Sequence, residues 1–367
     1  MRPRWPWPLH PSRWCRSSTT SLPDGSRAPA DLDPLTQGTL GATLAQSAAK
    51  PQKIRAFAVA GAVAGLAPDL DILIRSATDP IVYLEFHRQF SHSLAFIPIG
   101  AGLCALVLAP LLKRWLTGRE LYLATLLGYA SHGLLDACTS YGTQLFWPFS
   151  DLRVAWNLIS VVDPLFSVPL FALMAAAAWR RKRALAVAGL AWVLAYLTIA
   201  VAQQQRALET ATAAAEARGH LPAELTLKPG FANLLIWKAI YLADGHIHVD
   251  GIRVVGSGEL CPGGRIPLLD LNRDLPWLDP ASQQAKDLDR FRWYSGGWLA
   301  LDPGDPNYVV DVRYAALPNR IDALWGLKLD PGAADSTHSR WHVVRSRRSE
   351  NLNQLFGLLK GDGCRPV

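Results

Sequence analysis

The chain has 367 residues, of which 50% are hydrophobic and only 18% are charged, and its formal net charge is +7. Residues 56–202 carry few charges outside short clusters, whereas residues 203–367 have the composition of an ordinary soluble domain. Clusters of Lys and Arg residues flank the apolar segments, which is typical of an inner-membrane protein with basic cytoplasmic loops. We therefore expect a lipid bilayer around the first part of the chain, and no nucleic acid as a partner.

The first 32 residues are rich in Pro and Arg and lack the apolar core of a secretory signal. We expect a disordered tail, or a start codon assigned too early, with contact to lipid headgroups as the alternative. The following run, Asp33-Pro34-Leu35-Thr36-Gln37, predicts a helix start, because Asp33 can cap, Pro34 suits the first helical position and Gln37 can complete a capping box. A short helix of small residues should extend to about Ala49.

Five apolar segments follow, and each approaches the roughly 20 residues that a helix needs to cross a bilayer. They cover residues 56–74, 93–112, 120–139, 158–179 and 184–202. The prediction is a mainly α protein, in which residues 33–202 form a polytopic helical membrane bundle of about five apolar helices. Residues 203–230 are expected to form a polar helix and linker that lead out of the membrane.

The last part of the chain, residues 231–367, alternates short apolar and polar runs such as HIHVDGIRVV and YVVDVRY between Gly, Pro and Asp turns. This pattern predicts a small β-rich extramembrane domain. The five cysteines include no Cys-x-x-Cys pair, so a cysteine zinc site is not expected. Only Cys261 and Cys364 are expected to pair with each other.

The orientation follows from three basic clusters, in residues 50–55, 113–119 and 180–183. If the segments cross alternately, all three clusters lie on one side, which the positive-inside rule makes cytoplasmic. We therefore predict a multi-pass inner-membrane protein whose C-terminal domain is periplasmic.

Carboxylates and imidazoles gather at the ends of the apolar segments that face the opposite side. His132 and Asp136 are four residues apart, so they share one helical face and can address one ion. Neutral imidazoles and carboxylates are the usual ligands of divalent metals in catalytic sites. The predicted ligands of a divalent metal, Zn²⁺ with Mn²⁺ or Mg²⁺ as alternatives, are Asp69, Asp71, His87, His92, His132, Asp136 and Asp163.

Two of these assignments stay open. Asp69 and Asp71 can serve two ions, or one of them can bind the ion while the other orients a histidine. Asp163 precedes Pro164 and can equally be a helix cap.

A second set of polar residues, Arg88, Ser91 and Ser93, surrounds the start of the second apolar segment. Amide donors at a helix start, together with a guanidinium group, suit a phosphate, so we assign these three residues to catalysis. Ser91 can alternatively be only an N-cap.

Several motifs recur together in one known family. They are Asp33-Pro34-Leu35-Thr36-Gln37, Pro68-Asp69-Leu70-Asp71, His87-Arg88 with Ser91-His92-Ser93, His132 with Asp136, and Ser140-Tyr141-Gly142-Thr143-Gln144 leading to Trp147-Pro148-Phe149-Ser150. Over residues 33–200 the chain resembles the YdjM-type inner-membrane proteins, which are described as metal-dependent hydrolases and also carry a LexA-binding label. The family looks distantly similar to the zinc-dependent phospholipase C superfamily, and this resemblance implies phosphoester hydrolysis.

The leading hypothesis is therefore a membrane-embedded metal-dependent hydrolase that acts on a phosphoester or other ester at the periplasmic membrane surface. Its substrate would be a phospholipid or a phosphorylated small molecule. The alternatives are a membrane-anchored binding or regulatory protein with a protein partner, and an ion-coupled transporter, because acids within apolar helices often line transport pathways.

Overall fold

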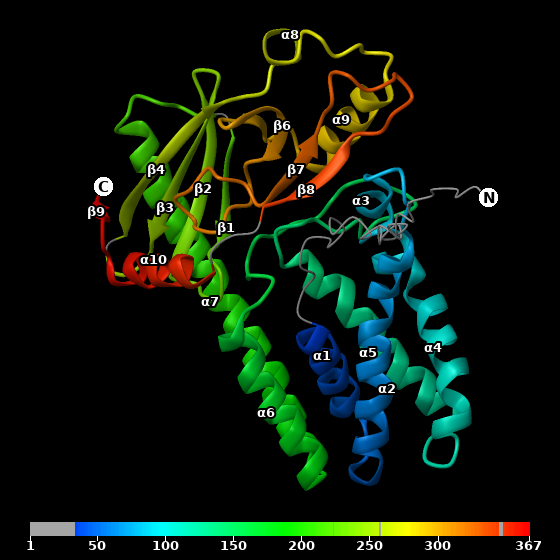
Figure 1. Cartoon of the computed structure of the whole chain (residues 1–367). Coiled ribbons are helices and arrows are strands. Elements are labelled where there is room, and N and C mark those ends of the chain that lie inside the picture. Colours follow the sequence, from blue (N-terminus) through cyan, green and yellow to red (C-terminus); the bar gives the residue numbers. More distant parts are fainter. Residues whose placement is uncertain (1–33, 223, 257, 345–347) are drawn as a thin grey trace, which may run out of the picture.

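The computed structural model describes residues 34–222, 224–256, 258–344 and 348–367. It consists of a helical part, which contains slightly more than the first half of the described chain, and a β-rich part that covers one end of it (Figure 1). The predictions for residues 1–32 and for the cap at Asp33 lie outside the described residues. Within them, the coarse prediction of a helical region followed by a β-rich domain is confirmed.

The helical part has six main helices and several short turns of helix among the described residues. The main helices are α1 (Pro34–Ala48), α2 (Ile54–Leu66), α4 (Ile97–Leu112), α5 (Gly118–Ala137), α6 (Pro164–Arg180) and α7 (Arg183–Glu216). The short elements are α3 (Val82–Phe86) and the 3-10 helices η1 (Pro51–Lys53), η2 (Ala67–Leu73), η3 (Phe90–His92) and η4 (Leu94–Phe96).

Three helical stretches of the described chain are long and apolar enough to cross a membrane, namely Pro51–Leu73, Leu94–Leu112 and Arg183–Glu216. The predicted number of about five is not confirmed. Helix α6 is apolar, but it begins at Pro164 and has only 17 residues. Helix α5 carries a carboxylate and an imidazole side chain on its buried face. The fifth apolar segment and the predicted polar helix are one continuous helix of 34 residues, α7.

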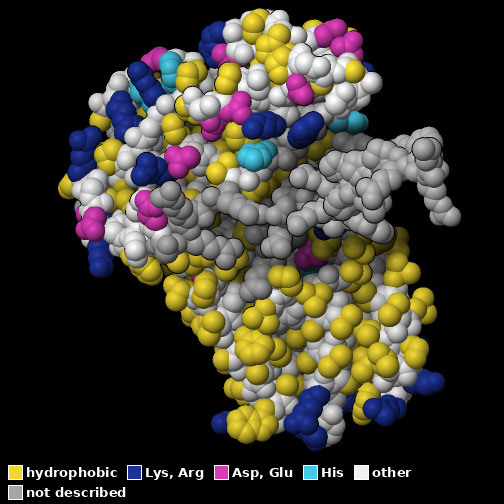
Figure 2. Space-filling view, viewed as in Figure 1, with side chains coloured by type: hydrophobic (Ala, Val, Ile, Leu, Met, Phe, Trp, Pro, Cys, Tyr) yellow, Lys and Arg dark blue, Asp and Glu magenta, His cyan; other side chains and the backbone are white. Residues whose placement is uncertain are grey.

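The surface of the helical part is divided by side-chain type. On the face in Figure 2, hydrophobic side chains cover the flank of the bundle, and Lys and Arg gather at the end farthest from the β-rich part. The basic residues lie at the start of α2, after α4 and at the junction of α6 and α7. This distribution is the one that the positive-inside rule associates with a helical membrane domain.

The β-rich part contains two antiparallel sheets, and its first strand lies within residues that were predicted to be linker. The five-stranded sheet has the order β1 (Leu225–Pro229), β2 (Ile236–Ala243), β3 (His246–Arg253), β4 (Glu259–Pro267), β9 (Arg365–Pro366). The four-stranded sheet has the order β5 (Leu299–Asp302), β6 (Asp305–Asp311), β7 (Trp325–Lys328), β8 (Arg340–Val343). Three helices accompany them, α8 (Leu271–Asp274), α9 (Gln283–Tyr294) and α10 (Arg348–Lys360).

The two parts of the protein share buried surface. Ala207 and Ala211 near the end of α7 belong to one hydrophobic cluster with Trp237 and Ile252 of the five-stranded sheet. The small alanine side chains let the sheet pack closely on the helix. The β-rich part is therefore held over one end of the bundle.

A second contact joins the loop after η2 to α9. Ile81 is fully buried in a cluster with Leu288 and Phe291. The Arg290 guanidinium donates to Glu85 at 2.6 Å and to Asp79 at 2.8 Å. The segment that leads to His87 is therefore fixed by the β-rich part.

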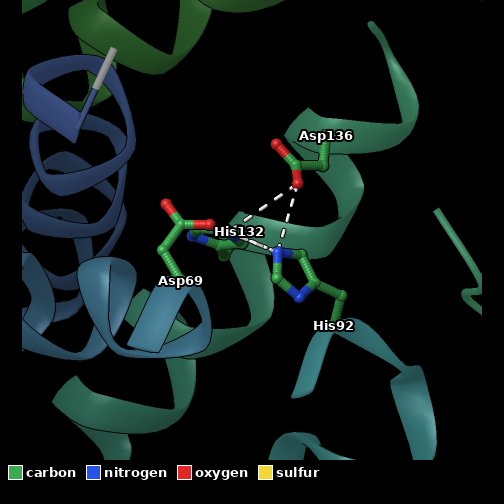
Figure 3. Close-up of side chains that lie close together, drawn as sticks. All are labelled: Asp69, His92, His132 and Asp136. Atoms are coloured by element: carbon green, nitrogen blue, oxygen red, sulfur yellow. Dashed lines mark hydrogen bonds and ion pairs between the residues drawn. The ribbon is translucent and has the colours of Figure 1, made fainter. Parts of the chain in front are cut away.

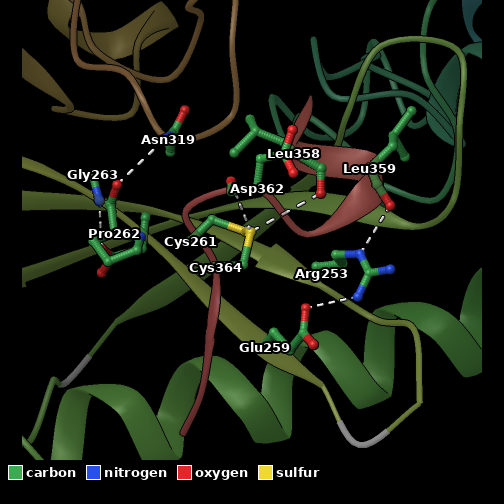
Figure 4. Close-up of a disulfide and its surroundings, with 11 residues drawn as sticks. Arg253, Glu259, Cys261, Pro262, Gly263, Asn319, Leu358, Leu359, Asp362 and Cys364 are labelled. Carbon is green, nitrogen blue, oxygen red and sulfur yellow. Dashed lines mark hydrogen bonds and ion pairs between the residues drawn. A yellow bond between two sulfur atoms is a disulfide. The ribbon is translucent and has the colours of Figure 1, made fainter. Parts of the chain in front are cut away.

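The predicted pairing of Cys261 with Cys364 is confirmed by a disulfide that joins β4 to the segment after α10 (Figure 4). Nearby, Arg253 donates to Glu259 at 2.7 Å and to the Leu359 carbonyl at 2.9 Å. These contacts attach α10 to the edge of the five-stranded sheet.

Candidate metal centre

Four of the predicted ligands meet where η2, η3 and α5 come together (Figure 3). His132 and Asp136 project from one face of α5, as their spacing predicts. Asp69 comes from η2, and His92 is the last residue of η3. His92, His132 and Asp136 are buried and Asp69 is partly exposed, so the group lies in a mostly desolvated position with one edge open.

The ligand atoms of these four residues all lie within 4.8 Å of one another. The Nε2 atoms of His92 and His132 are 2.9 Å apart. Asp69 Oδ1 lies 3.2 Å from the His132 Nε2 and 3.4 Å from the His92 Nε2. Asp136 Oδ2 lies 3.2 Å from the His92 Nε2. Two nitrogens and two oxygens therefore converge on a space of the size of one ion.

The other ring nitrogens decide which atoms of the two histidines carry protons. His132 Nδ1 is 2.6 Å from the Gly65 carbonyl oxygen, which can only accept, so Nδ1 donates. His92 Nδ1 lies 3.2 Å from Asp71 Oδ2 and 3.0 Å from the Ser91 hydroxyl, which itself donates to Asp71. In the neutral rings both Nε2 atoms then carry lone pairs.

Two nitrogen lone pairs 2.9 Å apart, beside two carboxylate oxygens, repel one another unless positive charge lies between them. A divalent cation would supply that charge, and the donor set of imidazoles and carboxylates is one that such ions use. Asp136 Oδ2 is buried and accepts no hydrogen bond in the described part of the chain, and it forms an ion pair with Arg88 Nε at 3.1 Å. The residues therefore fit a metal ion.

Asp71 contacts His87 and His92 and is not one of the four converging residues. Its Oδ2 accepts from the Ser91 hydroxyl at 2.7 Å and from the Arg88 backbone N–H at 3.1 Å, and its Oδ1 lies 2.8 Å from His87 Nδ1. A carboxylate that holds the far nitrogen of a ligand histidine fixes the tautomer and orientation of the ring. Of the two alternatives for the Asp69 and Asp71 pair, the geometry favours Asp69 as ligand and Asp71 as the orienting residue.

His87 lies beside the four residues but not among them. With Asp69 and Asp71 it forms a second group whose ligand atoms lie within 4.8 Å of one another. The two groups share Asp69, so the alternative of two ions also has a geometric basis.

The approach of His92 to α5 depends on Gly133, which follows the candidate ligand His132. A Cβ atom on Gly133 would lie 2.3 Å from the His92 backbone oxygen. Real Cβ atoms essentially never come this close to another atom, so any larger residue would push η3 away from α5. The phenol of Tyr129, one turn earlier on α5, donates to the Ser91 carbonyl at 2.9 Å.

The guanidinium group of Arg88 is buried next to Asp136. Its Nε lies 3.1 Å from Asp136 Oδ2, and its Nη1 donates to Thr139 at 3.0 Å. The residue has a φ of 65°, an uncommon conformation for a side chain of this size that is often found at functional sites. Arg88 therefore contributes positive charge to the site through Asp136.

The two serines that were assigned to catalysis have structural hydrogen bonds. Ser91 donates to Asp71. Ser93 caps η4 by accepting from the Phe96 N–H at 3.3 Å, and it donates to the Phe90 carbonyl at 2.9 Å. The capping role that was considered for Ser91 thus belongs to Ser93.

Asp163 lies apart from both groups, in place of the predicted ligand role. Its Oδ1 accepts from the N–H groups of Leu165 and Phe166 at 3.1 and 3.3 Å, and its Oδ2 accepts from the Tyr196 hydroxyl at 2.6 Å. Pro164 occupies the first position of α6, which makes the preceding residue its N-cap. The capping alternative describes Asp163 correctly.

One residue that contacts the site, Gln37, was given a different role in the sequence analysis. Gln37 was expected to complete a capping box, but its side chain is buried and donates to Asp136 Oδ1 at 2.8 Å. The partners are 99 residues apart, so no local pattern identifies them. The sequence gives one sign of such a role, because Gln37 is a large polar residue in a helix of mostly small residues.

The fold and the site define a helical membrane domain with a buried centre of two histidines and two carboxylates that could hold a metal ion. Residues 32–207 match the model of the YdjM inner membrane protein family, which confirms the family resemblance for this region. The chain is also similar to "Uncharacterized protein YfhP" of Bacillus subtilis (strain 168), with 32% identity over 114 residues. That match covers 31% of this chain and 34% of the relative, so the chain spans about a third of its length. No solved structure matches the chain.

Proposed function

We propose that the protein is a membrane-embedded metal-dependent hydrolase that acts on a phosphoester or other ester at the periplasmic surface. The observation that carries this proposal is the convergence of the two Nε2 lone pairs of His92 and His132 with Asp69 and Asp136. A divalent cation at this position would polarise an ester oxygen and lower the pKa of a water molecule. Zn²⁺ suits two imidazoles and two carboxylates, and Mn²⁺ or Mg²⁺ are the alternatives.

The residues around the centre have separable tasks in this proposal. Asp71 and the Gly65 carbonyl hold the two imidazoles in the orientation that presents Nε2. The Arg88 guanidinium partly neutralises Asp136, which reduces the negative charge that an anionic substrate would meet. Asp69 has a partly exposed side chain, so substrate would approach from its side of the centre.

An apolar groove beside the centre supports a lipid-like substrate. The groove has a volume of about 510 Å³ and runs between η2 and α4. Leu103 and Val107 line it on α4 and are 54% and 74% exposed, on a helix apolar enough to span a membrane. Asp71 and Ser91 also line it. An acyl chain in this groove would bring a phospholipid ester bond close to the metal centre.

The periplasmic assignment is supported by the charge distribution. The centre follows the end of α2, whereas the basic clusters lie at the start of α2, after α4 and between α6 and α7. By the positive-inside rule the basic end is cytoplasmic. Alkaline phosphatase fused after Val367 is expected to be active, and the same enzyme fused within residues 113–119 is expected to be inactive. The reverse result would move the centre to the cytoplasmic face.

Hydrolysis is tested with the full chain in mixed micelles that contain a fluorogenic phospholipid. Activity is expected to disappear after treatment with a chelator, to return with Zn²⁺ or Mn²⁺, and to be absent in His132→Ala. The matched control is His342→Ala, an exposed histidine of β8, which should retain wild-type activity. A chain that binds metal but cleaves neither phosphoesters nor carboxylic esters would contradict the hydrolase proposal and leave the metal centre intact.

A further inference from the structure

A second site lies between the helical and β-rich parts, in a cavity of about 240 Å³. The helical part contributes Ser140 and Tyr141, which follow α5, and the β-rich part contributes Lys228, Lys238 and Arg313. None of the residues of the metal centre lines this cavity. Its wall therefore combines cationic side chains from one part of the protein with a loop from the other.

The two lysines are almost completely buried, with 5% and 4% of their surface exposed for Lys228 and Lys238. Lys228 Nζ donates to the Ser140 carbonyl at 3.1 Å and lies 4.5 Å from the centre of the Tyr314 ring. Lys238 Nζ donates to the Arg320 carbonyl at 2.7 Å. Neither lysine forms a salt bridge with a carboxylate in the part of the chain that the structure describes.

The remaining charges near the cavity do not balance the lysines. Arg313 is paired with Asp311, at 2.6 Å between Nη2 and Oδ2. Asp311 also favours the charged form of Lys238, as does the exposed Asp322. For Lys228, Asp311 also favours the charged form, and the neighbouring cations Arg313, Lys238 and Arg153 oppose it. The cavity therefore has an excess of basic groups over acidic ones.

Burial of an ammonium group without a counter-charge is costly, and a protein often avoids the cost by losing the proton. Burial lowers the pKa of Lys238 to about 7 even though Asp311 and Asp322 raise it. Burial, together with Arg313, lowers the pKa of Lys228 well below its usual range. A bound anion would remove this penalty by restoring a partner for both ammonium groups.

We propose that this cavity binds a phosphate group, either as a free anion or as the headgroup of a lipid, through Lys228 and Lys238. Ammonium groups form short, charge-assisted hydrogen bonds with phosphate oxygens. An aromatic wall supports the site, because the Tyr314 ring stacks on Tyr141 at a centroid distance of 4.9 Å and lies tilted against Trp325 at 4.6 Å. The cavity volume exceeds that of a phosphate group, so part of an attached ligand would also fit.

The same wall connects the anion site to the metal centre. Tyr141 lies under the Arg88 guanidinium, with 5.1 Å from its Cζ to the ring centre, and Arg88 contacts Asp136. An anion that fixes Tyr141 would therefore also fix the arginine beside the metal ligands. The anion site itself does not depend on hydrolase activity.

The first test is calorimetric titration of the full chain in detergent with inorganic phosphate. All proteins carry His132→Ala, so that phosphate at the metal centre does not contribute. We expect saturable binding that Lys228→Met and Lys238→Met each weaken roughly 10- to 100-fold, as for the loss of a charge-assisted hydrogen bond. The control Lys286→Met changes an exposed lysine of α9. It should bind phosphate as tightly as the His132→Ala protein with all lysines intact.

A second readout separates binding from folding defects. At pH 8 Lys238 is mostly neutral without a ligand, so anion binding should take up a proton, which is measured by titration in two buffers of different ionisation enthalpy. The Lys238→Met protein should show less proton uptake.

Nanodiscs that contain phosphatidic acid or only phosphatidylcholine test whether the bound phosphate group belongs to a lipid headgroup. Thermal stabilisation by phosphatidic acid that both lysine variants abolish, without binding of inorganic phosphate, would assign the site to a lipid headgroup. Binding of inorganic phosphate would assign it to the phosphate group alone. The absence of both effects would overturn the proposal. So would Lys228→Met and Lys238→Met proteins that bind phosphate as tightly as the His132→Ala protein with both lysines intact.

Discussion

Replacement of Gly133 by Ala tests the geometry of the metal centre without changing a ligand. The new Cβ would lie 2.3 Å from the His92 oxygen, so η3 must move by about 1 Å to reach ordinary van der Waals contact. His92 Nε2 would move relative to His132 Nε2, which is now 2.9 Å away. Overpacking of this kind costs about 1–3 kcal/mol, which exceeds the gain of about 1 kcal/mol from replacing a helical Gly by Ala.

The matched control is Gly102→Ala in α4, where the nearest atom to a new Cβ is a Tyr122 ring carbon at 3.9 Å. This change should stabilise the protein by up to about 1 kcal/mol, because only the helix propensity changes. Gly133→Ala should lower the melting temperature and weaken Zn²⁺ affinity roughly 10- to 100-fold, as changes next to ligand histidines do. Affinity is measured by competition with a fluorescent chelator. If Gly133→Ala behaves like Gly102→Ala in both assays, the close contact of His92 with α5 does not exist.

Three further predictions concern other contacts. Asp163→Ala should lower the free energy of unfolding by about 1–2 kcal/mol, because α6 loses its N-cap, and the metal content should not change. A loss of bound metal would show that Asp163 is a metal ligand after all. Cys261→Ser with Cys364→Ser should cost about 2–5 kcal/mol in chemical unfolding, because the disulfide closes a loop with a sequence separation of 103, and an unchanged midpoint would contradict this. The pKa of Lys238 is about 7 in the fold and 10.5 in the unfolded chain, so the unfolded state binds more protons between these values. Wild-type stability without phosphate should therefore rise with pH in this window, and Lys238→Met should rise less; equal slopes would refute the assignment.

Much of the candidate metal centre can be predicted from the sequence because its candidate ligands occur in short local patterns. The spacing of His132 and Asp136 places both on one face of α5, and an acidic pair after an apolar helix is conspicuous where charge is costly. The role of Asp71 was one of two predicted alternatives, since the direction of a side chain at a helix end depends on the local backbone. Here η2 turns Asp71 toward His92.

Long-range contacts could not be predicted from local patterns. Gln37 reaches Asp136 across 99 residues, and Lys228 reaches Ser140 across 88 residues. The two halves of α7 were predicted as separate elements because hydropathy falls where the apolar residues end, whereas the Ala-rich sequence that follows continues the same helix. The predicted number of membrane spans exceeds the three long apolar stretches of the described chain, partly because of α5. This helix has a polar buried face, which lowers its hydropathy.

The measurement that tests the central claim most directly is the metal content of the full chain after purification in detergent and dialysis against trace divalent metals. Elemental analysis of the wild-type protein and of His342→Ala should find about one or two divalent ions per chain, since one or both ligand groups can be filled. His92→Ala and His132→Ala should lose the ion held by the four converging residues. A wild-type protein that contains no stoichiometric metal and takes up none on addition of Zn²⁺, Mn²⁺ or Mg²⁺ would contradict the account.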